Sequence, residues 1–203
     1  MKEDKELKDM KELIAEEEKE EEKIPSVSED SNSWGLDPRL TLSLISNGIQ
    51  NFFPIQRQVI PETLAQSRIP SSLGRDMCIS ASTGSGKTLV FVTTVLNALS
   101  NISKNKKVRA LVLLPSRNLA QQVYLEFLKH SKSVDLNVAL ICGFESFIAE
   151  QFRLTGNTPQ PPLMKTFLNK NSSSSTTGGG GGGTSEVDIV VGTPGRIVDH
   201  IDS

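Results

Sequence analysis

The sequence predicts an α/β fold in which helices flank a parallel sheet. Short apolar runs rich in β-branched residues alternate with segments whose apolar residues recur at helical spacing. Alternation of strands and helices implies right-handed crossovers and therefore parallel strands. A turn rich in glycine and serine, at residues 81–88, separates the first apolar run from the helix that follows it.

Four strands and two main helices are expected in chain order. Met77–Ala81 is the first apolar run, and Val108–Leu114 (VRALVLL) is long and apolar enough to predict a strand buried on both faces. Val138–Cys142 and Val187–Val191 are the third and fourth predicted strands. The helices are predicted by two stripes at helical spacing, one formed by Leu89, Val92, Val95, Leu96 and Leu99, and the other by Ala120, Val123, Tyr124, Phe127 and Leu128.

Two segments differ in composition from this pattern. Residues 1–23 hold 11 acids and 6 lysines, whereas the whole chain of 203 residues has 24 acids against 22 bases. We therefore expect residues 1–33 to form an acidic arm that is disordered or partly helical. Residues 155–185 contain three prolines, four consecutive serines and six consecutive glycines, which predicts a flexible insertion. Residues 34–203 are then expected to form one domain around this insertion.

Composition also excludes several classes of protein. No apolar run approaches the ~20 residues of a membrane span, and the charged N-terminus lacks the apolar segment of a signal peptide. Cys78 and Cys142 are far apart and lack metal-ligand spacing, so neither a disulfide scaffold nor a zinc site is expected. We expect a soluble intracellular protein with no membrane partner.

The segment Ala81–Thr88 (ASTGSGKT) carries the strongest chemical signal. It fits the phosphate-loop pattern G-x-x-x-x-G-K-[ST] except at Ala81, and a predicted strand precedes it and a helix follows it. Loop amides and the helix N-terminus supply partial positive charge for a phosphate, Lys87 neutralises phosphate oxygens, and the Thr88 hydroxyl ligates Mg²⁺. A chance glycine turn is the alternative, which Lys-Thr at the helix start makes improbable. The predicted nucleotide-binding residues are Ala81, Ser82, Thr83, Gly84, Ser85, Gly86, Lys87 and Thr88.

Three further motifs accompany the phosphate loop. Phe52–Gln56 (FFPIQ) lies upstream of it, Pro115–Ala120 (PSRNLA) follows the second predicted strand, and Gly192–Arg196 (GTPGR) follows the fourth. With these motifs in this order, residues 34–203 resemble the DEAD-box ATP-dependent RNA helicases of superfamily two. The resemblance implies the first of two RecA-like domains, with ATP as nucleotide, Mg²⁺ as cofactor and RNA as partner.

Site roles follow from this resemblance residue by residue. Gln56 would read adenine, because a side-chain amide offers both donors and an acceptor to the edge of that base. Thr193 is expected to cap a helix that begins at Pro194. The residues that would hold the RNA backbone are Pro115, Ser116, Arg117, Gly143, Thr193, Pro194, Gly195 and Arg196.

The chain departs from the usual family pattern at several positions. Phe52-Phe53 stands where Pro-Thr is usual, Asn118 replaces an acid, and Cys142-Gly143 stands in place of Gly-Gly. The pattern GIQNFFPIQRQVIP resembles a divergent branch associated with assembly of the large ribosomal subunit. That likeness implies pre-ribosomal RNA and assembly-factor proteins as partners, and the nucleus or nucleolus, otherwise the cytoplasm, as location.

The sequence stops at Ser203, before the D-E-A-D and S-A-T motifs of the family. We therefore expect a C-terminally truncated first helicase domain that is inactive by itself, because no catalytic carboxylates follow an apolar strand. In the family's sheet the S-A-T strand lies beside the phosphate-loop strand, so Met77–Ala81 is expected to lack a neighbour on one side. Two alternatives stay open: a module that binds nucleotide or a partner protein without catalysis, and a DNA-directed motor of superfamily two.

Overall fold

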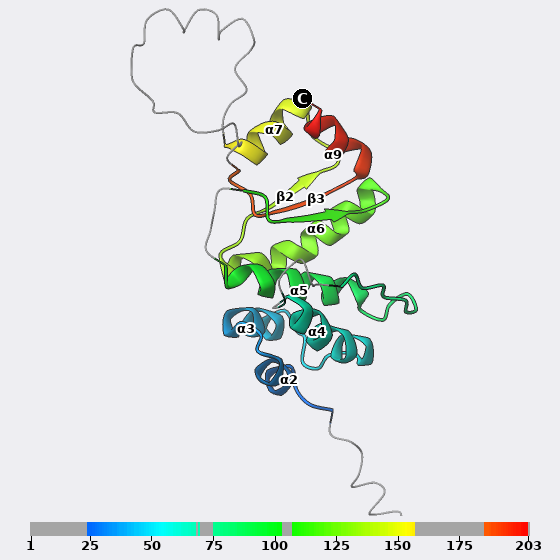
Figure 1. Ribbon diagram of the computed structural model, residues 1–203, viewed down its shortest axis with the longest axis vertical. Coiled ribbons are helices and arrows are strands. Elements are labelled where there is room, and N and C mark those ends of the chain that lie inside the picture. The colour runs from blue at the N-terminus through cyan, green and yellow to red at the C-terminus, as the bar shows by residue number, and fades with distance from the viewer. Residues whose placement is uncertain (1–23, 68, 70–74, 103–106, 157–184, 203) are drawn as a thin grey trace, which may run out of the picture.

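The computed structural model describes residues 24–67, 69, 75–102, 107–156 and 185–202 (Figure 1). Most of the predicted acidic arm and of the predicted insertion therefore lies outside the described residues. The described elements are α2 (Val27–Trp34), α3 (Pro38–Ser46), α4 (Pro54–Ser67), α5 (Lys87–Ser100), β1 (Ala110–Leu113), α6 (Arg117–Ser131), the 3₁₀ turn η1 (Lys132–Val134), β2 (Val138–Ile141), α7 (Phe147–Thr155), β3 (Ile189–Gly192) and α9 (Pro194–Ile201).

The sheet is parallel, as predicted, and its strand order is β1-β3-β2. The last strand in the chain is therefore the middle one, with Val190 opposite both Leu111 and Ala139. All four residues of β3 are buried, which is the pattern of a strand covered on both faces. Because the strands are parallel, their carboxyl ends meet at one edge of the sheet.

Helices cover both faces of this sheet (Figure 1). α6 lies against one face of the sheet, and α5, α4, α3 and α2 lie beyond it on that same side. α7 and α9 lie on the opposite face, where Leu154 and Ile197 pack on a small cluster that includes Ile141 and Val190. The arrangement is the flanked parallel sheet predicted from the sequence.

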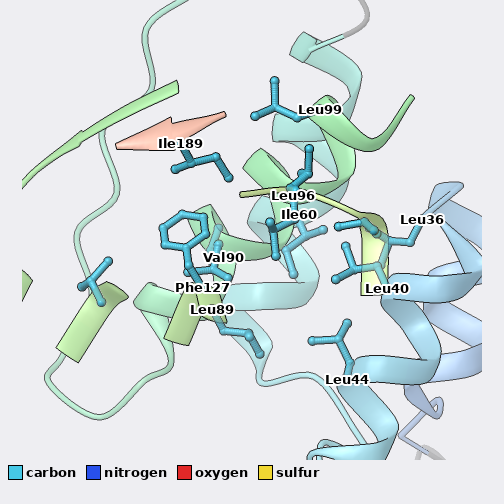
Figure 2. Close-up of a cluster of buried hydrophobic side chains, with 14 of the residues drawn as sticks. Leu36, Leu40, Leu44, Ile60, Leu89, Val90, Leu96, Leu99, Phe127 and Ile189 are labelled. Carbon is cyan, nitrogen blue, oxygen red and sulfur yellow. The ribbon is translucent and has the colours of Figure 1, made fainter. Parts of the chain in front are cut away.

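The main core lies between α6 and the helices α5, α4 and α3, which lie on the same side of the sheet. Figure 2 shows Phe127 of α6 facing Val90 of α5 and Ile189 of β3, while Ile60 of α4 packs nearby. The stripe predicted for α5 is largely confirmed, since Val92 and Leu96 are fully buried and Leu89 and Leu99 nearly so. In α6 the inward residues are Ala120, Val123 and Phe127.

α2 belongs to the packed body, although its residues fall almost wholly within the predicted arm. Val27 is fully buried, and its N–H donates to the carbonyl of Gln50 at 2.8 Å. The helix begins with a capping box, in which Ser26 and Glu29 satisfy each other's backbone N–H groups. The packed structure therefore begins before Trp34.

The prediction that Val108–Leu114 is buried on both faces is wrong. The strand spans only Ala110–Leu113, and Leu111 and Leu113 are each 51% exposed. β1 stands at the edge of the described sheet, and α7 and α9 cover the other two strands on that face. Ala110 and Val112 point to the main core, so alternate residues remain exposed.

Met77–Ala81 does not form a strand among the described residues, contrary to the prediction. Met77 is 40% exposed and Cys78 is also exposed. A strand needs a partner for its N–H and C=O groups, and no described strand lies beside this segment. The phosphate loop that follows is therefore held by α4 and α5 rather than by the sheet.

The two chain segments that border residues 157–184 are joined by hydrogen bonds. Glu186 N–H donates to the carbonyl of Leu154 at 3.0 Å, and the Ser185 hydroxyl donates to the same oxygen at 2.9 Å. α7 ends at Gly156, whose φ of 68° is left-handed. This closure joins the end of α7 to the segment that leads into β3.

Candidate nucleotide and RNA site

The phosphate loop has the conformation that its glycines predict. Gly84 and Gly86 have φ of 81° and 82°, a left-handed region that other residues adopt rarely. Gly86 is the N-cap of α5 and makes no side-chain cap, so the first amides of the helix are not capped by a side chain. Within the described residues no hydrogen bond is donated by the N–H groups of Thr83, Gly84, Gly86 or Lys87. These amides are available to an anion.

Lys87 folds back over the loop. Its Nζ donates to the carbonyl oxygens of Ala81 at 2.7 Å and Ser82 at 2.6 Å. These two carbonyls hold the ammonium group against the loop itself. The Thr88 hydroxyl is one residue further into α5 and half-buried.

Gln56 is buried and bridges α4 and the phosphate loop. Its Oε1 accepts from the N–H of Phe53 at 2.8 Å, and its Nε2 donates to the carbonyl of Gly86 at 3.0 Å. A Cβ added to Gly86 would collide with this amide and with the Phe53 ring. Gln56 therefore supports the loop, and one N–H of its amide and one lone pair remain for a base.

Two cavities border the loop, and Phe53 lines both. One has a volume of about 400 Å³ and is lined by Phe53, Pro54, Ile55, Ala81, Ser82, Gly84 and Ser85. The other, of about 370 Å³, is lined by Gln56 and Thr88 and, on another side, by α6 residues that include Leu119. Phe53 stands where the family usually has threonine. It is 54% exposed, so its aromatic ring is accessible from both cavities. Most of the predicted nucleotide-binding residues thus line one or the other of two cavities at the start of α5.

The residues predicted to bind RNA gather at the carboxyl ends of the three strands. Arg117 follows β1, Gly143 follows β2 and Arg196 follows β3. A Cβ added to Gly143 would lie 3.5 Å from Nη2 of Arg117 and 3.7 Å from Nε of Arg196. Two guanidinium groups, from the first turns of α6 and α9, thus stand beside the same glycine, which favours binding of an anion.

The remaining predicted RNA-binding residues frame this cluster. Ser116 caps α6, since its hydroxyl accepts from Leu119 N–H at 3.3 Å, and Pro115 precedes it. α9 begins at Pro194 as predicted, but the Thr193 side chain makes no cap hydrogen bond. Gly195 has open space around its Cα. Helix α9 therefore starts with free amides at the same edge of the sheet.

Glu150 of α7 is the acid that holds this cluster together. Its Oε1 accepts from the N–H groups of Cys142 at 3.2 Å and Gly143 at 2.8 Å. Its Oε2 accepts from Arg196 Nε at 2.7 Å and contacts His200 Nε2 at 2.9 Å. Burial alone would raise the pKa of this carboxyl, but the hydrogen bonds from His200, Gly143 and Arg196 outweigh it and hold the pKa below its usual value.

Sequence reasoning missed Glu150, although the sequence contains a signal for it. Phe147, Glu150 and Leu154 recur at helical spacing on one face of α7, and Leu154 packs on the small core. An acid on the apolar face of a helix indicates a buried charge that needs partners. Phe147 and His200 were also missed; their rings stack with centroids 4.3 Å apart.

Two kinds of feature are absent from the described residues. Among the described residues no group of three or more histidine, cysteine, aspartate or glutamate side chains is placed to hold a metal ion. No helix in the described part of the chain has the length and hydrophobicity needed to cross a bilayer.

Comparison with known proteins relates the chain to helicases by a family sequence pattern and by individual relatives. The sequence pattern of the family described as DEAD/DEAH box helicase matches residues 53–203. The chain is 41% identical over 174 residues to the ATP-dependent RNA helicase DDX51 of Danio rerio, covering 83% of this chain and 23% of that protein. Its identity to DDX51 of Homo sapiens is 38% over 174 residues, with 82% and 23% covered. The chain thus spans about a quarter of the length of these relatives.

Solved structures show the same fold. A DEAD box protein from Methanococcus jannaschii is 26% identical, with a TM-score of 0.55 over 82% of this chain and 35% of that protein. Dbp5 of S. cerevisiae, solved with RNA and ADP BeF3, matches the fold with a TM-score of 0.57 at 21% identity over 85% of this chain and 34% of that chain. The flanked parallel sheet is therefore that of a RecA-like helicase domain. By its sequence and its fold, this chain belongs to the DEAD/DEAH box helicase family.

Proposed function

We propose that this chain binds ATP at residues 81–88 and the RNA backbone at the carboxyl edge of its sheet, as the first RecA-like domain of an ATP-dependent RNA helicase. The observation that carries the proposal is the pairing of Arg117 and Arg196 beside Gly143, on the same sheet-and-helix unit as a phosphate loop with free amides. α6 links the two sites, because it begins at Arg117 and its Leu119 lines the cavity that contains Thr88.

The residues present fit a magnesium nucleotide. Thr88 provides one hydroxyl next to the loop amides, and Mg²⁺ commonly keeps water and phosphate oxygens as its other ligands. Ser85 Oγ is buried with no hydrogen-bond partner among the described residues, so the loop holds an unused polar group. We propose that Thr88 holds Mg²⁺ and that Lys87 moves from the Ala81 and Ser82 carbonyls to the phosphates.

The proposed contact with RNA is to phosphate and not to base edges. Arginine side chains and the free amides at the start of α9 bind phosphate oxygens without reading sequence. Arg117 is exposed, and it forms no ion pair among the described residues. In the complete protein, we propose that ATP binding and hydrolysis are coupled to separation of RNA strands.

The biological setting is proposed from the GIQNFFPIQRQVIP pattern and from the relatives named DDX51. It comprises ribosome biogenesis, with pre-ribosomal RNA and assembly factors as partners and the nucleolus as location. We also propose that the packed domain begins at α2 rather than at Trp34, with residues 1–23 as the acidic arm and 157–184 as the insertion.

The test measures two binding events on the purified chain. Calorimetry with Mg–ATP, and fluorescence anisotropy with a labelled single-stranded RNA, should both show binding. Lys87→Ala should remove ATP binding and keep RNA binding, whereas Arg117→Ala should do the reverse. Loss of one phosphate contact should also lower the slope of log affinity against log salt by about 0.7. Nucleotide binding without RNA binding would favour the non-catalytic module, and preference for the matching DNA would favour a DNA-directed motor.

A further inference from the structure

Glu150 is the most completely paired buried acid in the described structure. It is 1% exposed, and its two oxygens contact four groups from two other segments of the chain. Two of these groups are the backbone N–H groups at the end of β2, and the other two are Arg196 and His200 of α9. A buried carboxylate is tolerated only when such partners replace water.

The partners of Glu150 are groups that the proposed RNA site depends on. Its bond to Gly143 N–H fixes the left-handed turn, with φ of 78°, that keeps the position beside the two arginines free of a side chain. Its bond to Arg196 uses Nε only. Of the terminal nitrogens, Nη1 lies 3.7 Å from the exposed carboxylate of Asp199, and neither donates a hydrogen bond within the described residues. Glu150 thus leaves the outer part of the guanidinium for an anion.

Aromatic contacts restrict the same arginine further. The guanidinium carbon of Arg196 lies 5.1 Å from the centroid of the Phe147 ring, and His200 stacks on that ring. Glu150 therefore holds the guanidinium of Arg196 through Nε, and the Phe147 ring contacts the same guanidinium through a cation–π interaction. A side chain with few remaining rotamers loses less entropy when it binds a phosphate.

We propose that Glu150 is a positioning residue of the RNA interface: it orients Arg196 and the Gly143 turn so that Arg196 and Arg117 face the same phosphate. This inference rests on the proposed function, because it presupposes that the cluster binds RNA. Glu150 itself does not contact RNA, since it lies beneath the glycine turn with both oxygens engaged.

The proposal predicts that neutralising Glu150 changes RNA affinity in the direction opposite to that expected from charge alone. Removal of a negative charge near a phosphate-binding site should tighten RNA binding if charge alone matters. Loss of the orienting carboxylate should weaken it instead, because the same arginine then has to be ordered by the RNA. The sign of the change therefore separates the two explanations.

The experiment compares Glu150→Gln with Glu145→Gln in the full chain, by anisotropy with labelled single-stranded RNA over a series of salt concentrations. Glu145 is a matched control, since it lies just before α7 and pairs with Arg153 at 2.6 Å while its side chain is 45% exposed. Glu150→Gln should weaken RNA binding about tenfold, as for loss of one charge-assisted hydrogen bond. Its salt slope should fall by about 0.7, as for one lost phosphate contact. Glu145→Gln should leave the slope unchanged and affinity equal or slightly higher.

Two further variants keep the test independent of folding. Arg196→Lys retains the charge, but its single ammonium group cannot donate to Glu150 and at the same time present a planar pair of N–H donors to a phosphate. The Arg196→Lys variant should therefore bind RNA as weakly as Arg196→Ala. In the Arg196→Ala background, Glu150→Gln should have a much smaller effect on RNA affinity than in the wild type. Calorimetry with Mg–ATP should show the same nucleotide affinity for every variant.

The outcomes distinguish the inference from the proposed function. Unchanged or tighter RNA binding by Glu150→Gln would overturn the positioning role, and so would wild-type affinity for Arg196→Lys. Additive effects of Glu150→Gln and Arg196→Ala would overturn it as well. If Glu150→Gln does not fold, Arg196→Lys decides the question alone. If the wild type shows no RNA binding, or Arg117→Ala does not weaken it, the proposed RNA function fails.

Discussion

The side-chain amide of Gln56 donates a hydrogen bond to the carbonyl oxygen of Gly86 at 3.0 Å, across thirty residues of sequence. This bond joins the first turn of α4 to the residue that begins α5. Because Gly86 is the N-cap of α5, any movement of Gln56 displaces the amides that are proposed to face phosphate. Gln56 therefore has a structural task besides the base contact that its motif implies.

Gln56→Ala should weaken binding of ATP about tenfold, as expected for loss of a buried hydrogen-bonding amide. Binding of GTP and of inorganic triphosphate should also weaken, but less, because these ligands lose only the support of the loop. Fluorescence titration with all three ligands measures the difference. Equal losses for ATP and GTP would remove the adenine-reading role from Gln56.

Lys87→Ala should abolish measurable binding of Mg–ATP and of inorganic triphosphate, because Nζ is the one side-chain cation placed on the loop among the described residues. Thermal stability should change little, since the ammonium contacts only two loop carbonyls. Calorimetry measures the binding, and Lys132→Ala, an exposed lysine in η1, is the control that should bind as the wild type does. Retained binding by Lys87→Ala would contradict the assignment of the phosphate loop.

Arg109→Ala should destabilise the domain by about 3 kcal/mol, because it leaves the buried carboxylate of Asp188 without its cation. Arg109 Nη2 lies 2.8 Å from Asp188 Oδ1, both side chains are under 10% exposed, and Asp188 also accepts from Asn137 N–H. A chemical denaturation series gives the free energy of unfolding. Arg153→Ala, which breaks the exposed pair with Glu145, should cost less than about 1 kcal/mol.

Stability should fall as the pH is lowered from 7.5 to 5.5, and His130 should be a main cause. Burial lowers the pKa of His130 below its model-peptide value of 6.5, an effect that Glu126 opposes and Lys129 reinforces. The unfolded chain then binds a proton near pH 6.5 while the folded chain does not, so stability is present above that pH and is lost below it.

His130→Asn tests this cause, because the amide still has a polar atom for Ser43, whose hydroxyl lies 2.9 Å from Nδ1. Urea unfolding at several pH values should show a flatter dependence for His130→Asn between pH 6.5 and 5.5. His200→Asn changes the only other histidine of the chain and should keep more of the wild-type dependence. The reverse ranking of the two variants would assign the pH dependence to His200.

The features predicted from sequence are those that local residues determine. Gly84 and Gly86 provide the left-handed φ values that the loop requires, and the convergence of Arg117, Gly143 and Arg196 follows once the strands are parallel. The roles assigned to these residues in binding stay predictions.

The features that sequence reasoning missed depend on distant parts of the chain. Met77–Ala81 has the composition of a strand, but a strand exists only where another strand supplies its hydrogen bonds. The exposure of Leu111 depends on how far α7 and α9 extend over the sheet. The helical spacing of Glu150 with Phe147 and Leu154 indicates a buried acid, but its partners Arg196 and His200 are 46 and 50 residues away, and no local pattern identifies them.

The hydrogen bonds of Leu154 with Ser185 and Glu186 hold together the two described segments that border residues 157–184. Because contacts outside that segment bring its two borders together, we expect a change in the number of residues between them to have little effect on folding. Added length costs closure entropy only logarithmically. The position therefore suits a fluorophore, an affinity peptide or a second domain, because the chain can be lengthened there without a change to the phosphate loop or the arginine cluster.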